Sequence, residues 1–136
     1  MYGIHHVALS VTDYQKSLEF YKQLNFSKVY FWEADDKSLS ITHLKNGDFI
    51  LELFCYSKPQ PAPNTIHSTD TDLPIVGTKH FGLKVDSIEA AYEDLLTKGL
   101  IDTSVQIAQG RTGIHYFFIE DPDGILVEIA EDKRSI

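Results

Sequence analysis

The stretch YFFIEDPDGILVEIA, residues 116–130, predicts a β-hairpin near the end of the chain. Pro122 presets φ for a tight turn, and Asp123-Gly124 tolerates the left-handed backbone that such a turn contains. Successive residues of a strand point to opposite faces, which places Glu128 among apolar neighbours in the second strand. Because a bare buried carboxylate is costly, we expect Glu128 to reach solvent or to meet a charged partner from elsewhere in the chain.

The composition is that of one ordinary globular domain. The chain has 136 residues, of which 43% are hydrophobic and 24% charged. Its net charge of −8 argues against nucleic acid or an anionic membrane as partner, and favours a small molecule or a protein. No apolar run approaches the roughly 18 to 20 residues of a spanning helix, and no signal peptide is expected. A single cysteine excludes an internal disulfide and predicts a cytoplasmic location.

The first half of the chain predicts a strand, a helix and three further strands. Residues 4–11 alternate between apolar and polar side chains, as in a half-buried strand. Asp13 fits the N-cap of the helix, and Asn25 fits the left-handed residue that follows it. The further strands are expected over residues 27–34, 39–44 and 48–56.

Asn46-Gly47 is the strongest hairpin signal, because both residues accept the positive φ of a type I′ turn. A two-residue turn at these positions pairs residue 43 with residue 50. His43 would then be a diagonal neighbour of Glu52 on the same face of the sheet.

Residues 58–77 contain four prolines among polar residues, which predicts a loop that serves as a linker or a lid. His67, within this loop, is expected to face solvent. Beyond the loop the earlier order resumes. The expected elements are a strand over residues 79–85, a helix that starts at a capping box of Asp86 and Glu89 and ends at Gly99, a weak strand over 104–108, and the final hairpin.

The two halves carry one pattern, which predicts an internal repeat. HVALSV at residues 6–11 and HFGLKV at residues 80–85 begin with histidine and alternate in the same sense. Each last strand carries a glutamate, Glu52 in the first half and Glu128 in the second. We therefore predict a single α+β domain of two βαβββ modules, over about residues 1–57 and 78–132. Two half-sheets facing each other would gather the two histidines and two glutamates at one centre.

The sequence resembles the vicinal oxygen chelate superfamily, which contains glyoxalase I, bleomycin resistance proteins and dioxygenases. The similarity covers nearly the whole chain. It implies that the two modules form a curved, open, barrel-like mixed sheet, and that the protein is a homodimer. The motifs that carry it are HVALSVTD at residues 6–13, SLEFY at 17–21 before LNF at 24–26, HFGLKV at 80–85, and EDPDG at 120–124 together with Glu128.

The resemblance also implies a metal site. The four positions that match the ligands of glyoxalase I are His6, Glu52, His80 and Glu128. Two imidazoles and two carboxylates suit one divalent ion: Zn, Ni, Co, Mn or Fe. In such a site the metal polarises a substrate carbonyl, while Glu128 or Glu52 removes the neighbouring proton. The expected activity is therefore a lactoylglutathione lyase-like isomerisation of a small carbonyl compound.

Four further residues are candidates for contact with the substrate. Arg111 either binds a substrate carboxylate or phosphate or is an ordinary exposed arginine. His43 either touches substrate or metal or is structural. Phe54 and Tyr116 either line a pocket or belong to the core.

Several alternatives stay open within the superfamily. Tyr30 and Tyr56 occupy positions that glyoxalase I uses to hold glutathione, so the thiol cofactor is undetermined. Methylmalonyl-CoA epimerase commonly has glutamine in place of Glu52, and the extradiol dioxygenases use three ligands. A metal-free binder of the bleomycin-resistance type is the alternative from another class, although it typically lacks the four ligands.

Overall fold

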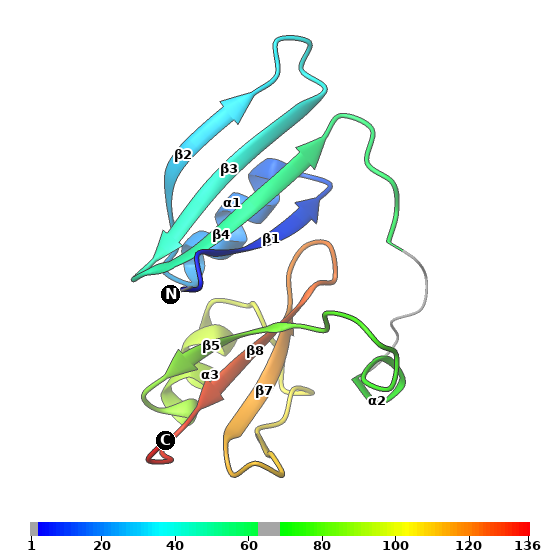
Figure 1. Cartoon of the computed structure of the whole chain (residues 1–136). Coiled ribbons are helices and arrows are strands. Elements are labelled where there is room, and N and C mark those ends of the chain that lie inside the picture. The colour runs from blue at the N-terminus through cyan, green and yellow to red at the C-terminus, as the bar shows by residue number, and fades with distance from the viewer. Residues whose placement is uncertain (1–2, 63–68) are drawn as a thin grey trace. The chain divides into compact units, whose positions relative to one another are not determined.

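The computed structural model describes residues 3–62 and 69–136. The chain forms two compact units, Met1–His67 and Ser68–Ile136. Each unit contains a strand, a helix and three more strands in that order (Figure 1), so the α+β class and the two βαβββ modules are confirmed. The union of both modules into a single domain stays a prediction.

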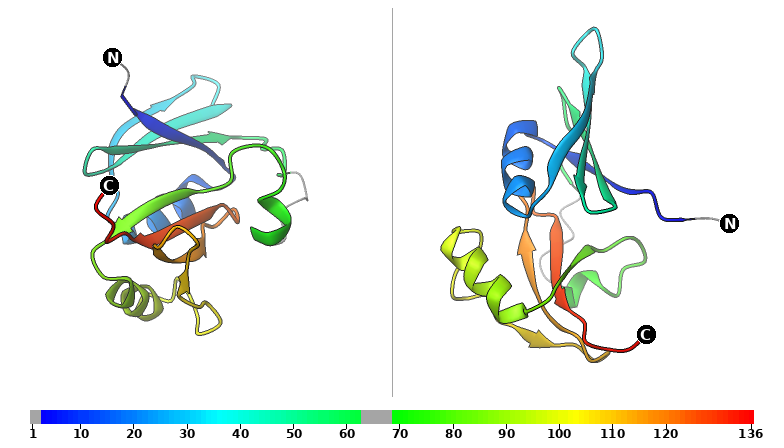
Figure 2. Two further views of the ribbon diagram at one scale, coloured as in Figure 1. Left: turned by 60° about the horizontal axis from the view of Figure 1, so that its bottom comes forward. Right: turned by 90° about the vertical axis from the view of Figure 1, so that its left-hand side faces the viewer.

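The first unit has a four-stranded sheet with the order β1-β4-β3-β2. Its first strand pairs in parallel with its last, and the other neighbours are antiparallel. The helix covers one face of this sheet (Figure 2). Its elements are β1 (His6–Val11), α1 (Tyr14–Gln23), β2 (Ser27–Glu33), β3 (Leu39–Asn46) and β4 (Phe49–Tyr56).

The second unit repeats this topology with the order β5-β8-β7-β6. Again the first strand is parallel to the last, and a helix covers one face of the sheet (Figure 2). A short helix, α2 (Thr69–Asp72), lies within the stretch expected to be a loop, and His67 is outside the described residues. The module elements are β5 (Phe81–Val85), α3 (Ile88–Thr97), β6 (Ala108–Gln109), β7 (His115–Glu120) and β8 (Leu126–Glu131).

Each core lies between the helix and the adjacent face of the sheet. Each module helix starts at a residue whose side chain accepts a hydrogen bond from a free amide group of the first turn. Asp13 caps α1 in this way by accepting from the Lys16 amide, as predicted. Asn25 follows α1 with φ 65, which confirms its left-handed conformation. The core side chains of the first unit are Val11, Phe20, Tyr21, Leu24, Phe26, Leu44, Leu51 and Leu53, and those of the second are Ile88, Leu95, Phe117, Ile119, Val127 and Ile129.

The predicted hairpin register between β3 and β4 is wrong. The turn consists of Gly47 and Asp48, Asn46 pairs with Phe49, and His43 lies directly opposite Glu52. Only the first turn residue has positive φ, 57 at Gly47, which is the pattern of a type II′ turn. Asn46 is held within the strand because its side-chain Nδ2 donates to the Leu24 carbonyl at 3.0 Å.

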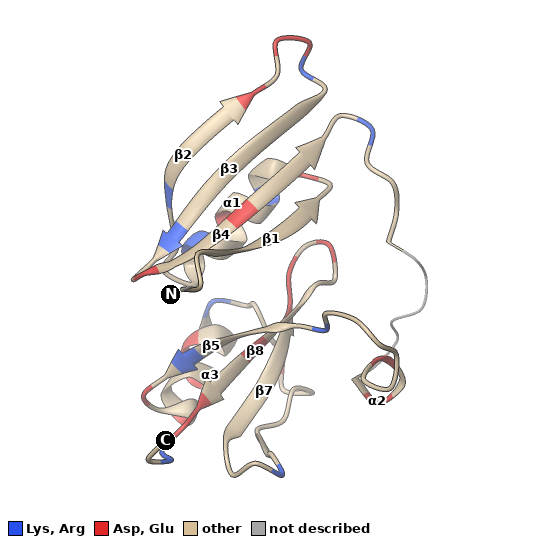
Figure 3. Ribbon diagram, in the orientation of Figure 1, with Lys and Arg blue, Asp and Glu red and all other residues tan. Residues whose placement is uncertain are grey.

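Two predicted boundaries in the second unit are also corrected. The cap of α3 is Ser87, whose Oγ accepts from the Ala90 amide at 3.2 Å, and not Asp86. The weak strand expected over residues 104–108 is confined to Ala108–Gln109. Within the described residues, no helix is long and apolar enough to cross a membrane. Figure 3 shows acidic and basic residues interspersed along both units.

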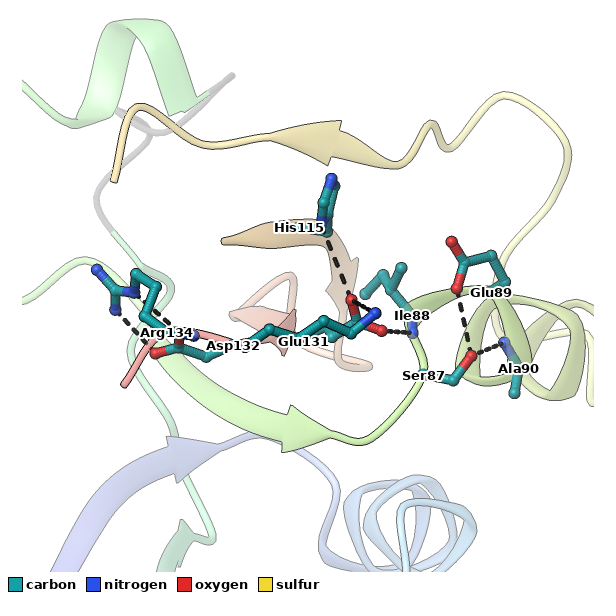
Figure 4. A network of polar contacts seen from close by, with 9 residues as sticks. Ser87, Ile88, Glu89, Ala90, His115, Glu131, Asp132 and Arg134 are labelled. Carbon is teal, nitrogen blue, oxygen red and sulfur yellow. Dashed lines mark hydrogen bonds and ion pairs between the residues drawn. The ribbon is translucent and has the colours of Figure 1, made fainter. Parts of the chain in front are cut away.

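Glu131 joins the end of β8 to the start of α3 (Figure 4). Its side chain is buried, and Oε2 accepts from the Ile88 amide at 3.1 Å. The Lys133 ammonium lies 2.7 Å from the other oxygen. Both contacts, first that with Lys133 and then that with Ile88, lower the pKa of the Glu131 carboxyl. Glu131 thus satisfies a helix N-terminal amide from a strand far away in sequence.

We expect Glu131→Gln to lower the thermal midpoint at pH 7, because the glutamine can accept from Ile88 but carries no charge. A pKa that is lower in the folded chain contributes stability above the unfolded value, about 4.3 for Glu, and this contribution is lost as pH falls toward the folded value. The difference between wild type and variant should therefore shrink as pH falls from 6 to 3. Thermal unfolding of wild type and variant between pH 6 and pH 3 measures this difference, with the exposed Glu120→Gln as control. A difference in thermal midpoint that does not change with pH would contradict the role of the Glu131 charge.

Candidate functional site

Glu52 is the central polar residue of the sheet face that points away from the core of the first unit. It is the single charged residue of β4. Its strand neighbours Leu51 and Leu53 are buried in the core, so alternation turns Glu52 to the opposite face. Across the sheet it lies in register between Ala8 on β1 and His43 on β3.

Two histidines flank this carboxylate. Nε2 of His43 lies 2.9 Å from Oε1 of Glu52, within hydrogen-bond distance. Nε2 of His6 lies 3.6 Å from the other oxygen, Oε2. The Glu52 side chain retains 18% exposure, so the carboxylate is neither bare nor fully removed from water.

The second unit places His80 and Glu128 together in the same way. Nε2 of His80 lies 3.0 Å from Oε2 of Glu128, so the residue that meets this carboxylate is a histidine. The Phe118 ring packs edge-on against the His80 ring at 4.9 Å. Nδ1 of His80 is buried and has no hydrogen-bond partner among the described residues. A buried ring nitrogen without a partner is unusual and is one mark of a side chain kept for a ligand.

The parallel strand pairs explain why the two units match. Glu52 pairs with Ala8, and Glu128 pairs with Gly82. Each histidine stands two residues before this small partner, on the same face, and so becomes a diagonal neighbour of the glutamate. A small residue between them leaves room for the carboxylate and the imidazole to approach. The repeat seen in the sequence is thus a repeat of side-chain geometry.

The units differ at the position opposite each glutamate on the antiparallel side. In the first unit this residue is His43, which contacts Glu52. In the second it is Phe118, which cannot donate a hydrogen bond to Glu128. Within the described residues Oε2 of Glu128 is contacted by His80, whereas both oxygens of Glu52 face an imidazole.

The other candidates lie at various distances from these pairs. Tyr116 is on β7 and shares the face of Phe118, whose ring lies 5.5 Å away. Phe54 shares the face of Glu52 on β4 and is half-buried. Arg111 is exposed and makes no hydrogen bond or ion pair among the described residues. Sequence reasoning missed the ring contact of Tyr30 on His43, at 5.6 Å, because it depends on the register of β2.

His5 precedes the first strand and lies next to His6. Its Nδ1 lies 2.8 Å from Nδ1 of His6. The strand begins at His6, so the alternation of β1 does not fix the direction of the His5 side chain. No signal in the sequence other than adjacency indicates this contact.

Each unit by itself supplies one histidine and one glutamate of the four predicted ligands. Imidazole nitrogen and carboxylate oxygen are donors that fit a borderline divalent ion. Over residues 3–62 and 69–136, no group of three or more His, Cys, Asp or Glu side chains is arranged to hold a metal. The donor atoms of the four residues therefore suit the expected divalent ion. That the four residues come together around one ion stays a prediction.

The chain matches the family of the Glyoxalase/Bleomycin resistance protein/Dioxygenase superfamily over residues 3–129. It belongs to this superfamily, which confirms the resemblance seen in the sequence.

Similar proteins span almost the whole chain. The uncharacterized protein YwkD of Bacillus subtilis (strain 168) is 29% identical over 131 residues, covering 95% of this chain and 96% of YwkD. The human mitochondrial methylmalonyl-CoA epimerase is 28% identical over 142 residues, covering 94% of this chain and 73% of the epimerase. The crystal structure of SMU.1112c superposes with a TM-score of 0.78 at 30% identity, covering 96% and 99% of the two chains. The superfamily thus includes enzymes.

Proposed function

We propose that the protein is a metal-dependent enzyme of the glyoxalase type that transfers a proton next to the carbonyl group of a small compound. The observation that carries this proposal is the His–Glu pair that recurs at matched positions of both units. The distance from histidine Nε2 to glutamate Oε2 is 3.6 Å in the first unit and 3.0 Å in the second. A single pair on a sheet surface is ordinary. Two pairs at equivalent positions of a repeat, each facing away from the core, are better explained by a shared ligand.

The residues proposed to hold the ion are His6, Glu52, His80 and Glu128. They come either from one chain or from two copies in a homodimer. Nε2 of His80 and Oε2 of Glu128 lie 3.0 Å apart, which supports a ligand shared by these two donors. A divalent ion bound there would polarise the carbonyl and stabilise negative charge on its oxygen. The net charge of −8 and the single cysteine favour a cytoplasmic enzyme that acts on a small molecule.

Glu128 is proposed as the general base. Its carboxylate is contacted at Oε2 by His80, and among the described residues Oε1 has no hydrogen bond or ion pair. In Glu52, by contrast, Oε1 lies 2.9 Å from His43 and Oε2 lies 3.6 Å from His6. Glu128 can therefore take the proton from the carbon next to the carbonyl and return it either to the adjacent carbon, which is an isomerisation, or to the opposite face of the same carbon, which is an epimerisation.

The substrate is proposed to lie against Phe54 and Tyr116, with Arg111 binding an anionic group. His43 is the fourth residue proposed near the substrate. The thiol cofactor of glyoxalase I is left open, because Tyr30 and Tyr56 stand where that enzyme holds glutathione.

Epimerisation of an acyl thioester is the second candidate. The similarity to human methylmalonyl-CoA epimerase over 94% of this chain favours it. Glu52 counts against it, since that enzyme commonly has glutamine at the matching position. Both candidates share the removal of a proton next to a carbonyl, which is the central step of the proposal.

Metal content is the first test. The wild type, produced with Zn²⁺, Ni²⁺ or Co²⁺ in the medium, should contain one divalent ion per chain by elemental analysis. His6→Ala and His80→Ala should each lose most of it, because each removes one donor. His115→Ala removes an imidazole that is no predicted ligand and should leave the metal content unchanged. Full activity after exhaustive chelation, or equal metal content in all variants, would refute the proposal and favour a metal-free binder.

Proton exchange is the second test. In deuterated water the enzyme should incorporate deuterium next to the carbonyl of its substrate, tested with methylglyoxal plus a series of thiols and with branched acyl-CoA thioesters. Glu128→Gln should reduce the rate by about 10²- to 10⁴-fold, the usual contribution of a general base. Mass spectrometry of the recovered compounds measures the deuterium incorporated over time. An undiminished exchange rate in Glu128→Gln would exclude this residue as the base.

A further inference from the structure

His43 contacts a glutamate in a way that Phe118, at the equivalent position of the second unit, cannot. It lies directly opposite Glu52 in the ladder between β3 and β4. Its Nε2 is 2.9 Å from Oε1 of Glu52, and its ring packs against Tyr30 at 5.6 Å. The His43 side chain is only 28% exposed, so strand geometry and an aromatic neighbour both restrict its ring.

The direction of this hydrogen bond follows from the chemistry of its partners. An ionised carboxylate only accepts, so Nε2 of His43 carries the hydrogen and donates it to Oε1. This fixes the rotation of the carboxylate about its last bond. Oε2 then faces the side of the sheet where His6 stands, 3.6 Å away.

The second unit shows what happens without this donor. Phe118 occupies the equivalent position and packs on His80, so the antiparallel neighbour of Glu128 has no side-chain donor for its carboxylate. The pseudo-symmetry of the two His–Glu pairs is therefore broken by one residue, an imidazole in one unit and a phenyl ring in the other.

We propose that His43 is a positioning residue that holds Glu52 by one oxygen and so presents the other oxygen, Oε2, to the metal. This inference rests on the proposed metal site. It assigns different roles to the two carboxylates: Glu52 is a fixed ligand, and Glu128 is free to move. His43 is assigned to Glu52 and not to the metal, because its Nε2 already lies within hydrogen-bond distance of Oε1 of Glu52, at 2.9 Å. A second residue that orients a ligand in this way typically changes metal affinity by about 10- to 100-fold.

The experiment measures Co²⁺ affinity of the full chain by competition with a chromogenic chelator, together with the visible absorption of bound Co²⁺. His43→Phe copies the residue of the second unit, and His43→Leu removes the donor without an aromatic ring. Both should weaken Co²⁺ binding by about 10- to 100-fold. His43→Gln retains an N–H at similar reach and should restore most of the affinity. His115→Phe, the same change at a histidine on β7, should leave the affinity unchanged. Circular dichroism establishes that each variant is folded.

A double-mutant cycle separates positioning from a general structural effect. If His43 acts through Glu52, His43→Phe should have no further effect on Co²⁺ affinity in a Glu52→Gln background. An equal loss in both backgrounds, or wild-type affinity in both His43→Phe and His43→Leu, would overturn the inference while the metal site stands. Loss of Co²⁺ in His43→Phe with full retention in Glu52→Gln would make His43 itself the ligand and would also overturn it. A wild type that binds no metal would overturn both proposals.

Discussion

The parallel pairing of the first and last strands is the constraint on which each unit depends. It brings residues more than forty positions apart in the sequence into neighbouring places on one sheet face. The antiparallel strands that follow extend the sheet, and the helix covers its other face. Because side chains alternate along a strand, the same pairing that buries Leu51 and Val127 turns Glu52 and Glu128 outward. In each unit, one face of the sheet therefore forms the core and the opposite face carries the candidate site residues.

This arrangement has an energetic cost that points toward function. A carboxylate in the middle of an apolar strand must give up part of its hydration, and a histidine contact offsets this only in part. Stability alone would be served as well by an apolar residue at either glutamate. The same chain uses a buried glutamate differently at Glu131, where an amide group and an ammonium group satisfy the carboxylate and join a strand to a helix. The contrast separates a structural carboxylate, whose two oxygens both meet protein donors, from Glu128, for which the described residues show one such contact, with His80.

The sequence allowed most of the fold to be predicted because local signals and the repeat agreed. The turn at Pro122 and Gly124, the cap at Asp13 and the alternation around Glu128 each lie within a few residues. The register of the first hairpin was mispredicted because a distant contact, from Asn46 to the Leu24 carbonyl, keeps Asn46 in the strand. The start of α3 was placed one residue too early, because Ser87 and not the adjacent Asp86 caps the helix through the Ala90 amide. The first error arises from a tertiary contact that a local pattern does not contain, and the second from a choice between two neighbouring residues that can both cap a helix.

The same distinction applies to the candidate site. The pairing of His80 with Glu128, and of His6 with Glu52, could be predicted from matched positions in the repeat. The direct contact of His43 with Glu52 could not, because it depends on the corrected register. The central claim is that both pairs bind one ion. Anomalous diffraction at the cobalt edge, from crystals of the Co²⁺-loaded protein, tests it most directly. We predict one anomalous peak per chain, in contact with His6, Glu52, His80 and Glu128. Separate peaks at the two pairs, a peak elsewhere, or none would contradict the claim.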